Sequence, residues 1–181
     1  MSDTLKPYTM ITDYLTGREI PNIGAEENRQ AVVRFLVEAK GYSKDDIAAD
    51  VNIEMWVAGK PYRSQVDLVV TGGAAQKRIM VFKCAAGSLG SREREIVAAA
   101  RLLDDYQIPL AVVSDGKTAI VLDTIAGRKI GEGLDAIPSK AAVLENMAAY
   151  RFAAFPRERL EREKLVFRTY DSENVNVQRN L

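Results

Sequence analysis

Two short runs rich in β-branched and apolar residues, separated by a glycine-containing loop, constrain the fold of this chain most strongly. The runs are SQVDLVVT (64–71) and KRIMVFKCA (77–85), and the loop between them is GGAAQ. Loops of this length that contain glycine are typical of β-hairpins. The sequence therefore predicts two antiparallel neighbouring strands in the middle of the chain.

The register of this predicted hairpin brings an acidic and a basic side chain close together. Pairing Thr71 with Lys77 puts Asp67 opposite Val81 and diagonal to Lys83, because successive side chains of a strand point to opposite faces. The other face is then wholly apolar, with the residues Val66, Leu68, Val70, Met80, Phe82 and Cys84. A shift by one residue would bury Lys83 among these side chains, so the hydrophobic pattern specifies which face it occupies.

Helical and extended patterns alternate on both sides of the hairpin. Helices are expected at 25–40 and from about 91 to 104, where apolar residues recur at helical spacing. Extended segments are expected at 49–58, 110–113 and 119–122. A helix between two strands implies a right-handed crossover. We therefore expect an α/β (α+β) fold, with a mixed β-sheet flanked by helices.

The patterns divide the chain into one domain and two appendages. Residues 1–22 show little periodicity and indicate an irregular lead-in, residues 23–138 form the domain, and residues 139–181 form a helical C-terminal extension. The extension includes the run RERLEREK (157–164), in which opposite charges stand four residues apart, as on an exposed helix.

Composition excludes several kinds of chemistry. The chain has no histidine among its 181 residues, which excludes serine–histidine and cysteine–histidine nucleophile pairs and histidine-bearing zinc sites. Its 25 Lys and Arg residues balance 25 Asp and Glu residues, so nucleic-acid binding would need a local basic patch. The N-terminus lacks the layout of a secretion signal, no apolar stretch has the length of a membrane helix, and the single Cys84 cannot form an internal disulfide. We therefore expect a cytoplasmic location without membrane attachment.

Asp67 and Lys83 are the strongest candidates for chemistry. Metal-assisted phosphodiester hydrolysis needs a carboxylate to hold a divalent ion such as Mg²⁺ and a lysine to position water and offset developing charge. The alternative is a cross-strand salt bridge on a solvated sheet face. Glu26 lies at the edge of the apolar stripe of its predicted helix, so it could point inward as a second acid. Its alternative role is a first-turn carboxylate favoured by the helix dipole.

The loop Gly87–Ser91 could present backbone N–H groups to a phosphate, although it matches neither a P-loop nor a dinucleotide-binding motif. The alternative is a turn with Ser91 as the N-cap of the following helix. Arg92 and Arg94, beside this loop, could contact a DNA backbone or simply be solvated.

Several short motifs occur in an order that points to a known family. They are Glu26–Gln30, Lys40–Tyr42, RSQVDLVV (63–70), RIMVFKCAAGSL (78–89), and Val112–Gly116 with Ala119–Thr124. In this order the chain, over roughly residues 20–138, resembles the N-terminal domain of type I restriction enzyme R subunits. The resemblance implies the restriction-endonuclease-like fold of the PD-(D/E)XK nuclease superfamily, whose motif is an acid on one strand followed by acid-x-lysine on the next.

The resemblance also implies roles for individual residues. Asp67 matches the metal-binding acid, Lys83 the lysine, and Glu26 the helix acid. Val81 stands where the acid-x-lysine triplet has its acid, so the motif is incomplete on this strand.

Some superfamily members supply the missing acid from the following helix, which would make Glu93 or Glu95 the substitute metal ligand.

The function implied is Mg²⁺-dependent cleavage of DNA, with four residues facing the nucleic acid. These are Arg63, Ser88, Arg92 and Arg94. The R subunits of this family also carry a helicase motor, for which this chain has no room, so we expect a stand-alone relative.

Two alternatives remain open. One is a catalytically degenerate relative that binds nucleic acid or a protein partner, as Val81 and the zero net charge suggest, and the other is a nucleotide-binding regulatory module that uses the glycine loop.

Overall fold

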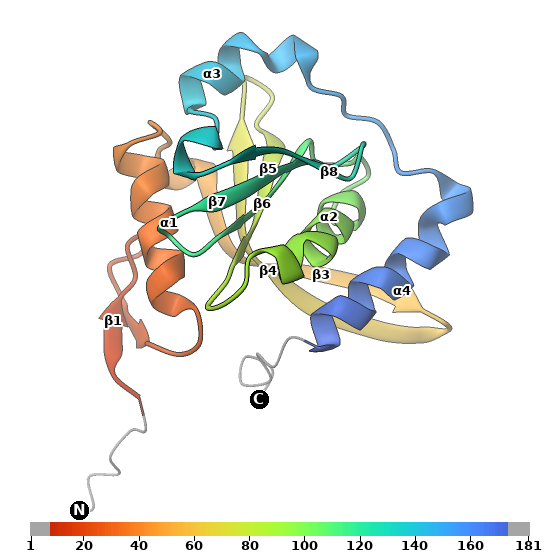
Figure 1. Ribbon diagram of the computed structural model, residues 1–181, viewed down its shortest axis with the longest axis horizontal. Helices are drawn as coiled ribbons and strands as arrows, with labels where there is room; N and C mark the ends of the chain where they lie inside the picture. The colour runs from red at the N-terminus through yellow and green to blue at the C-terminus, as the bar shows by residue number, and fades with distance from the viewer. Residues whose placement is uncertain (1–7, 174–181) are drawn as a thin grey trace, which may run out of the picture.

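The structure is a computed structural model that describes residues 8–173, and its centre is a six-stranded sheet (Figure 1). The strands are β3 (Ile47–Val57), β4 (Lys60–Gly72), β5 (Lys77–Cys84), β6 (Leu110–Ser114), β7 (Ala119–Asp123) and β8 (Arg128–Glu132). They lie side by side in sequence order, and each neighbouring pair is antiparallel except β5 and β6, which are parallel. The predicted mixed sheet of an α+β fold is confirmed.

Helices cover both faces of this sheet. Figure 1 shows α1 (Glu26–Glu38) on one side and α2 (Glu93–Leu102) with α4 (Arg157–Glu173) on the other. The short α3 (Lys140–Glu145) follows the sheet in sequence. The helix α2 connects the parallel strands β5 and β6, which is the crossover that the sequence predicts. The sheet thus separates two apolar cores, and each is closed by helices.

The predicted hairpin of β4 and β5 is present, but its register differs by one residue at the turn, where Gly72 lies opposite Lys77, and by two residues from Val70 to Leu68. Leu68 lies opposite Phe82 and Val70 opposite Met80, with a shift between Val70 and Thr71. Such a bulge could not be anticipated from the period-2 pattern, because it inserts a residue without changing the apolar alternation before it. A shift of two keeps every side chain of the regular segment on its predicted face. Continuing this register places Asp67 opposite Lys83 rather than opposite Val81.

One residue of the predicted apolar face lies on the wrong side. Val66 packs in the core under α2 and α4, whereas the other five residues of that face pack in the core under α1. The pairing of β3 with β4 is interrupted between Ala49–Leu68 and Val51–Val66, where Asp50 has a φ of +51°. The ribbon therefore turns over at this point, and the side chains beyond it face the opposite core.

Short elements account for the remaining differences from the prediction. β1 (Met10–Thr12) and β2 (Glu19–Pro21) form a two-stranded ribbon in the lead-in that the sequence marks as irregular, because three-residue strands carry no readable alternation. The last sheet strand, β8, was also unpredicted. The N-terminal part of the lead-in (1–7) and the end of the C-terminal extension (174–181) lie outside the described residues. Within the described part of the chain, no helix combines the length and apolar character needed to cross a membrane.

The turn between β6 and β7 depends on the absence of a side chain at Gly116. This residue has a φ of +83°, and a Cβ there would lie 2.7 Å from the Cβ of Ala31 on α1. We expect Gly116→Ala to lower the free energy of unfolding by about 1–3 kcal/mol, because it adds backbone strain and a clash. Urea unfolding would measure the loss. Gly87→Ala is the matched control, since a Cβ at Gly87 would meet nothing within 4 Å, and it should change stability by less than about 0.5 kcal/mol. Equal stabilities of the two variants would contradict this account.

Candidate functional site

Three charged side chains from three consecutive elements meet at the twisted part of the sheet. They are Asp67 of β4, Lys83 of β5 and Glu95 of α2. The Lys83 ammonium nitrogen lies 3.1 Å from Glu95 Oε1 and 4.0 Å from Asp67 Oδ2. All three residues are buried, with exposed fractions of 2% for Asp67, 8% for Lys83 and 3% for Glu95. The pair predicted from the hairpin is therefore not a salt bridge on a solvated sheet face.

Local structure holds each carboxylate in place. Asp67 Oδ2 accepts a hydrogen bond of 2.7 Å from the backbone N–H of Cys84, the residue that follows Lys83. Glu95 lies on the buried face of α2, next to Ile96, which packs against the sheet. Arg92 approaches the second carboxylate oxygen of Glu95 at 3.9 Å. The cluster is thus built from strand pairing and from the rotation of α2 about its axis.

The rotation of α2 about its axis depends on where the helix begins. The prediction that Ser91 is its N-cap was wrong. The hydroxyl of Ser91 donates a hydrogen bond of 2.9 Å to the carbonyl of Ser88 instead of accepting one from the helix. A 3₁₀ turn over Gly90–Arg92 precedes α2, and the N-cap residue is Arg92, without a side-chain cap. The glycine loop is consequently a turn that leads into the helix.

Burial perturbs the titration of this cluster. Burial raises the pKa of Glu95 to about 7, against the opposing attraction of Lys83, and the carboxylate of Asp171 on α4 raises it further. Burial alone would lower the pKa of Lys83, but the charges of Asp67 and Glu95 outweigh it and hold that pKa above its usual range. The lysine is therefore cationic at neutral pH, while the Glu95 carboxyl group is partly protonated near pH 7.

Little free space remains around the three charges. The cavity that they line measures about 10 Å³, and Phe167 of α4 forms part of its wall. A cavity of this size holds one water molecule at most. The helix that the sequence marks as an exposed, charge-laced segment thus covers the cluster. The one sequence signal for this was the spacing of Leu160, Glu163 and Phe167, which share one face of a helix.

Glu26 points inward, as its position on the helix predicts, and takes part in a buried network with Arg29 and Gln30. Its carboxylate accepts hydrogen bonds from Arg29 Nε at 2.9 Å and from Gln30 Nε2 at 2.8 Å. Arg29 also bonds to Asp50 at 3.2 Å, at the point where β3 turns over. Among Glu26's hydrogen bonds, those to Arg29 and Gln30 tie it to its own helix, which favours a role in fixing α1 against this bend.

The two candidates for the substitute acid point in different directions. Glu95 reaches Lys83, whereas Glu93 lines a separate cavity of about 370 Å³ between α2 and α4, together with Arg94. Val81, which stands at the place of the motif's acid, is completely buried in the apolar core. The geometry therefore selects Glu95 as the second carboxylate beside Lys83.

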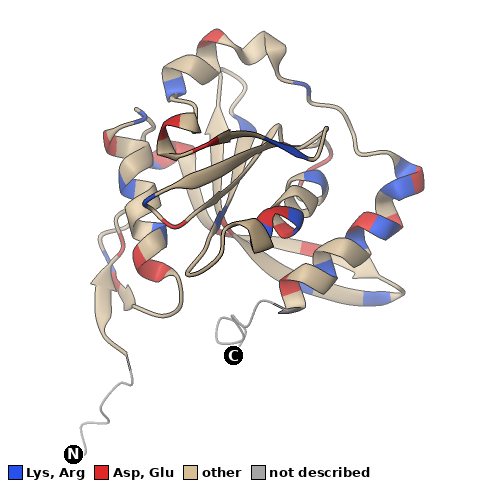
Figure 2. Cartoon of the chain, viewed as in Figure 1, with Lys and Arg blue, Asp and Glu red and all other residues tan. Residues whose placement is uncertain are grey.

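The residues expected to face nucleic acid do not share one environment. The side chain of Arg63 is 79% exposed and lies 3.3 Å from Glu54 on the neighbouring strand. Arg92 is half-buried beside Glu95, and Arg94 is exposed. Ser88 contributes its carbonyl to the turn before α2. Figure 2 shows basic and acidic residues interspersed rather than gathered on one face.

A divalent ion would find two carboxylates as ligands in this cluster, because the protonated Lys83 has no lone pair to offer. Within residues 8–173, no group of three or more Asp, Glu, Cys or His side chains is arranged to hold a metal ion. Mg²⁺, however, is commonly held by one or two carboxylates, with water and substrate phosphate completing its shell. Asp67 and Glu95 supply two such carboxylates, and the cavity beside them holds one water molecule at most.

Comparison with known proteins gave one match. The family model for the type I restriction enzyme R protein N terminus matches residues 24–138. Searches of curated proteins and of solved structures returned no match. The matched segment contains Asp67, Lys83 and Glu95 and ends before α3 and α4.

The raised pKa of Glu95 predicts a specific pH dependence of stability. The folded chain holds this proton up to about pH 7, whereas the unfolded chain releases it near the usual value of 4.5. Folding therefore gains stability at low pH that is lost as the pH rises through this window, by up to about 1.4 kcal/mol per pH unit.

Denaturant unfolding of Glu95→Gln in buffer with EDTA, between about pH 5 and pH 8, should show this slope removed. Glu93→Gln serves as the control and should keep the slope of the unmodified chain. An unchanged slope in Glu95→Gln would show that another group carries it.

Proposed function

The chain belongs to the family of type I restriction enzyme R protein N-terminal domains, and on this premise we propose that it is a Mg²⁺-dependent nuclease domain that hydrolyses DNA phosphodiesters. The observation that carries the proposal is the contact of 3.1 Å between Lys83 and Glu95, in the same buried cluster as Asp67. It restores two acids and a lysine to one site although Val81 replaces an acid on β5. Under this proposal the domain is a PD-(D/E)XK nuclease whose second acid comes from α2.

Each residue of the cluster has a role in this chemistry. Asp67 and Glu95 would hold Mg²⁺, which supplies charge stabilisation and makes bound water a better nucleophile. Asp67 needs no reorganisation, because the N–H of Cys84 already fixes its carboxylate. Lys83 remains protonated, so its ammonium can orient a water molecule and stabilise negative charge that develops on the phosphate. Glu26 would act indirectly, by holding α1 at the bend of β3.

Nucleic-acid contacts would come from the surface near the N-terminus of α2. Arg92 lies beside Glu95, whereas Arg94 lines the separate cavity with Glu93, so the two would contact different parts of a nucleic-acid backbone. Arg63, on the exposed β3–β4 ribbon, would contact the backbone further away. With zero net charge, the chain has no long-range attraction for DNA, so these local contacts must supply the affinity.

Cleavage of plasmid or labelled DNA with Mg²⁺ or Mn²⁺ tests the proposal. Asp67→Asn, Lys83→Ala and Glu95→Gln should each lower the cleavage rate by about 10²–10⁴, because each removes a group that binds the ion or stabilises the transition state. EDTA should abolish cleavage. Glu93→Gln is the matched control, since it lies two residues from Glu95 on the same helix but outside the cluster, and it should retain activity. Cleavage that survives unchanged in all three cluster variants would identify a contaminating nuclease and contradict the proposal.

A second candidate is a catalytically degenerate domain that binds nucleic acid or a protein partner without cleaving. The burial of Val81 and the 10 Å³ cavity favour it, because neither leaves room for an additional ligand.

Binding of a labelled duplex across a salt series separates the two binding modes. If phosphate contacts drive binding, log affinity should fall linearly with log salt, and Arg94→Ala should reduce the slope by about one. Arg151→Ala, on the irregular segment before α4, is the control and should leave the slope unchanged. Binding to a protein partner without any salt-dependent DNA affinity would argue for the protein-binding role.

A further inference from the structure

The helix α4 lies outside the segment that matches the restriction family, yet it covers the Asp67–Lys83–Glu95 cluster. We propose that α4 is an autoinhibitory element that occupies the surface through which a substrate must approach Lys83. The identity of that substrate as DNA rests on the proposed function. The covering itself rests on the contacts of α4.

An aromatic side chain closes the site. Phe167 is 2% exposed and lines the cavity of about 10 Å³ together with Asp67, Lys83 and Glu95. The ring of Tyr62 on β4 packs edge-on against it, with centroids 6.2 Å apart and planes at 81°. A phosphodiester is far larger than one water molecule, so it cannot reach the ammonium of Lys83 while Phe167 stays in place.

Polar contacts fasten the helix at two points. At its C-terminal end, Asp171 accepts a short hydrogen bond from the hydroxyl of Tyr62 and one of 2.9 Å from Ser64. One turn before Phe167, Glu163 forms a buried ion pair of 2.9 Å with Arg101 on α2. Asp171 also adds a negative charge beside Glu95, where it raises the pKa of that group. An anionic phosphate would be repelled from the same region.

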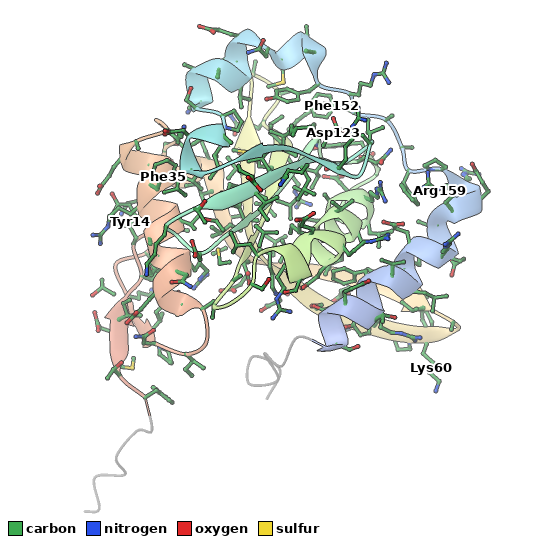
Figure 3. All side chains as sticks on the ribbon, in the orientation of Figure 1. Tyr14, Phe35, Lys60, Asp123, Phe152 and Arg159 are labelled. Carbon is green, nitrogen blue, oxygen red and sulfur yellow. The ribbon has the colours of Figure 1, made fainter. Side chains whose placement is uncertain are left out.

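The described side chains of α4 are mostly exposed or half-buried, although the helix packs along α2. Between residues 157 and 172, only Glu163 and Phe167 are fully buried. Figure 2 shows acidic and basic residues along the rest of α4. In Figure 3, Arg159 marks the first turn of this helix and Lys60 the tip of the β3–β4 ribbon. The preceding segment, 150–156, contains no helix or strand. Such an element can open locally while the sheet stays folded.

Chemical labelling of Lys83 tests whether α4 blocks access to this residue, and it does not depend on enzymatic activity. In the full chain, an amine-acetylating reagent followed by peptide mass spectrometry should label Lys83 at least about fivefold faster in Phe167→Ala than in the unmodified chain. Leu165→Ala is the matched control, because Leu165 lies on the exposed face of the same helix, and its rate should not change. Circular dichroism checks that both variants fold. An unchanged rate in a folded Phe167→Ala variant would overturn the proposal.

A tethered variant decides the question if Phe167→Ala does not fold. In Ser64→Cys/Asp171→Cys, a short bismaleimide can join α4 to β4, and Cys84 is buried and should not compete. Tethering should slow the labelling of Lys83 at least about fivefold relative to the untethered double variant, because the helix can no longer leave. Equal labelling rates with and without the tether would overturn the proposal.

DNA cleavage, measured on the same samples, separates this inference from the proposed function. We expect cleavage to rise in Phe167→Ala and to fall on tethering, in parallel with labelling. If the labelling rate of Lys83 changes with Phe167→Ala and with the tether, but no form of the protein cleaves DNA, the nuclease assignment is contradicted and the covering role of α4 stands. If cleavage depends on Lys83 but the tether does not change it, the autoinhibitory role of α4 is overturned and the nuclease assignment stands.

Discussion

A buried ammonium group held between two carboxylates is the interaction on which the rest of this structure depends. Removing Lys83, Asp67 and Glu95 from water is costly, and their mutual attraction offsets that cost only with good geometry and additional hydrogen bonds. The N–H of Cys84 supplies one such bond, and the position of α2 supplies the other carboxylate. The position of α2 against β5 is therefore fixed both by the ion pair between Glu95 and Lys83 and by apolar packing. It also places the carboxylate of Glu95 beside Lys83, while Val81 on the strand is buried in the apolar core.

The bend in the β3–β4 ribbon gives the cluster its place. At Asp50 the ribbon turns over, so that residues before and after it face different cores. Asp67 lies on the opposite strand at this turn, where it can face α2 beside Val66, while Leu68 packs in the core under α1. The network of Glu26 and Arg29 binds the same bend from α1. Two helices on opposite sides of the sheet thus converge on one irregularity, and the family match spans all of these parts.

Local patterns in the sequence predicted the hairpin, the crossover helix and the proximity of Asp67 to Lys83, because each depends on residues close together in the chain. The two-residue error in register has two sources. Gly72 rather than Thr71 lies opposite Lys77, and a bulge after Val70 adds the second residue, which leaves no trace in the alternation of apolar residues. The choice between Glu93 and Glu95 stayed open because the rotation of α2 depends on a 3₁₀ turn rather than on a cap at Ser91. The burial of Phe167 was missed because it comes from a contact about a hundred residues away in sequence, with Tyr62. The roles of these residues in catalysis and metal binding remain predictions.

The order of β4, β5, α2 and α4 along the chain has a consequence for how the domain matures. β4, β5 and α2 follow one another directly, so their side chains can meet as soon as this stretch of the chain and its sheet partners have been synthesised. The helix α4 comes from a later segment, so it can dock only after that segment has been synthesised. A nascent chain would therefore pass through an interval in which the charged centre is assembled and still open, and the length of that interval would be set by translation speed.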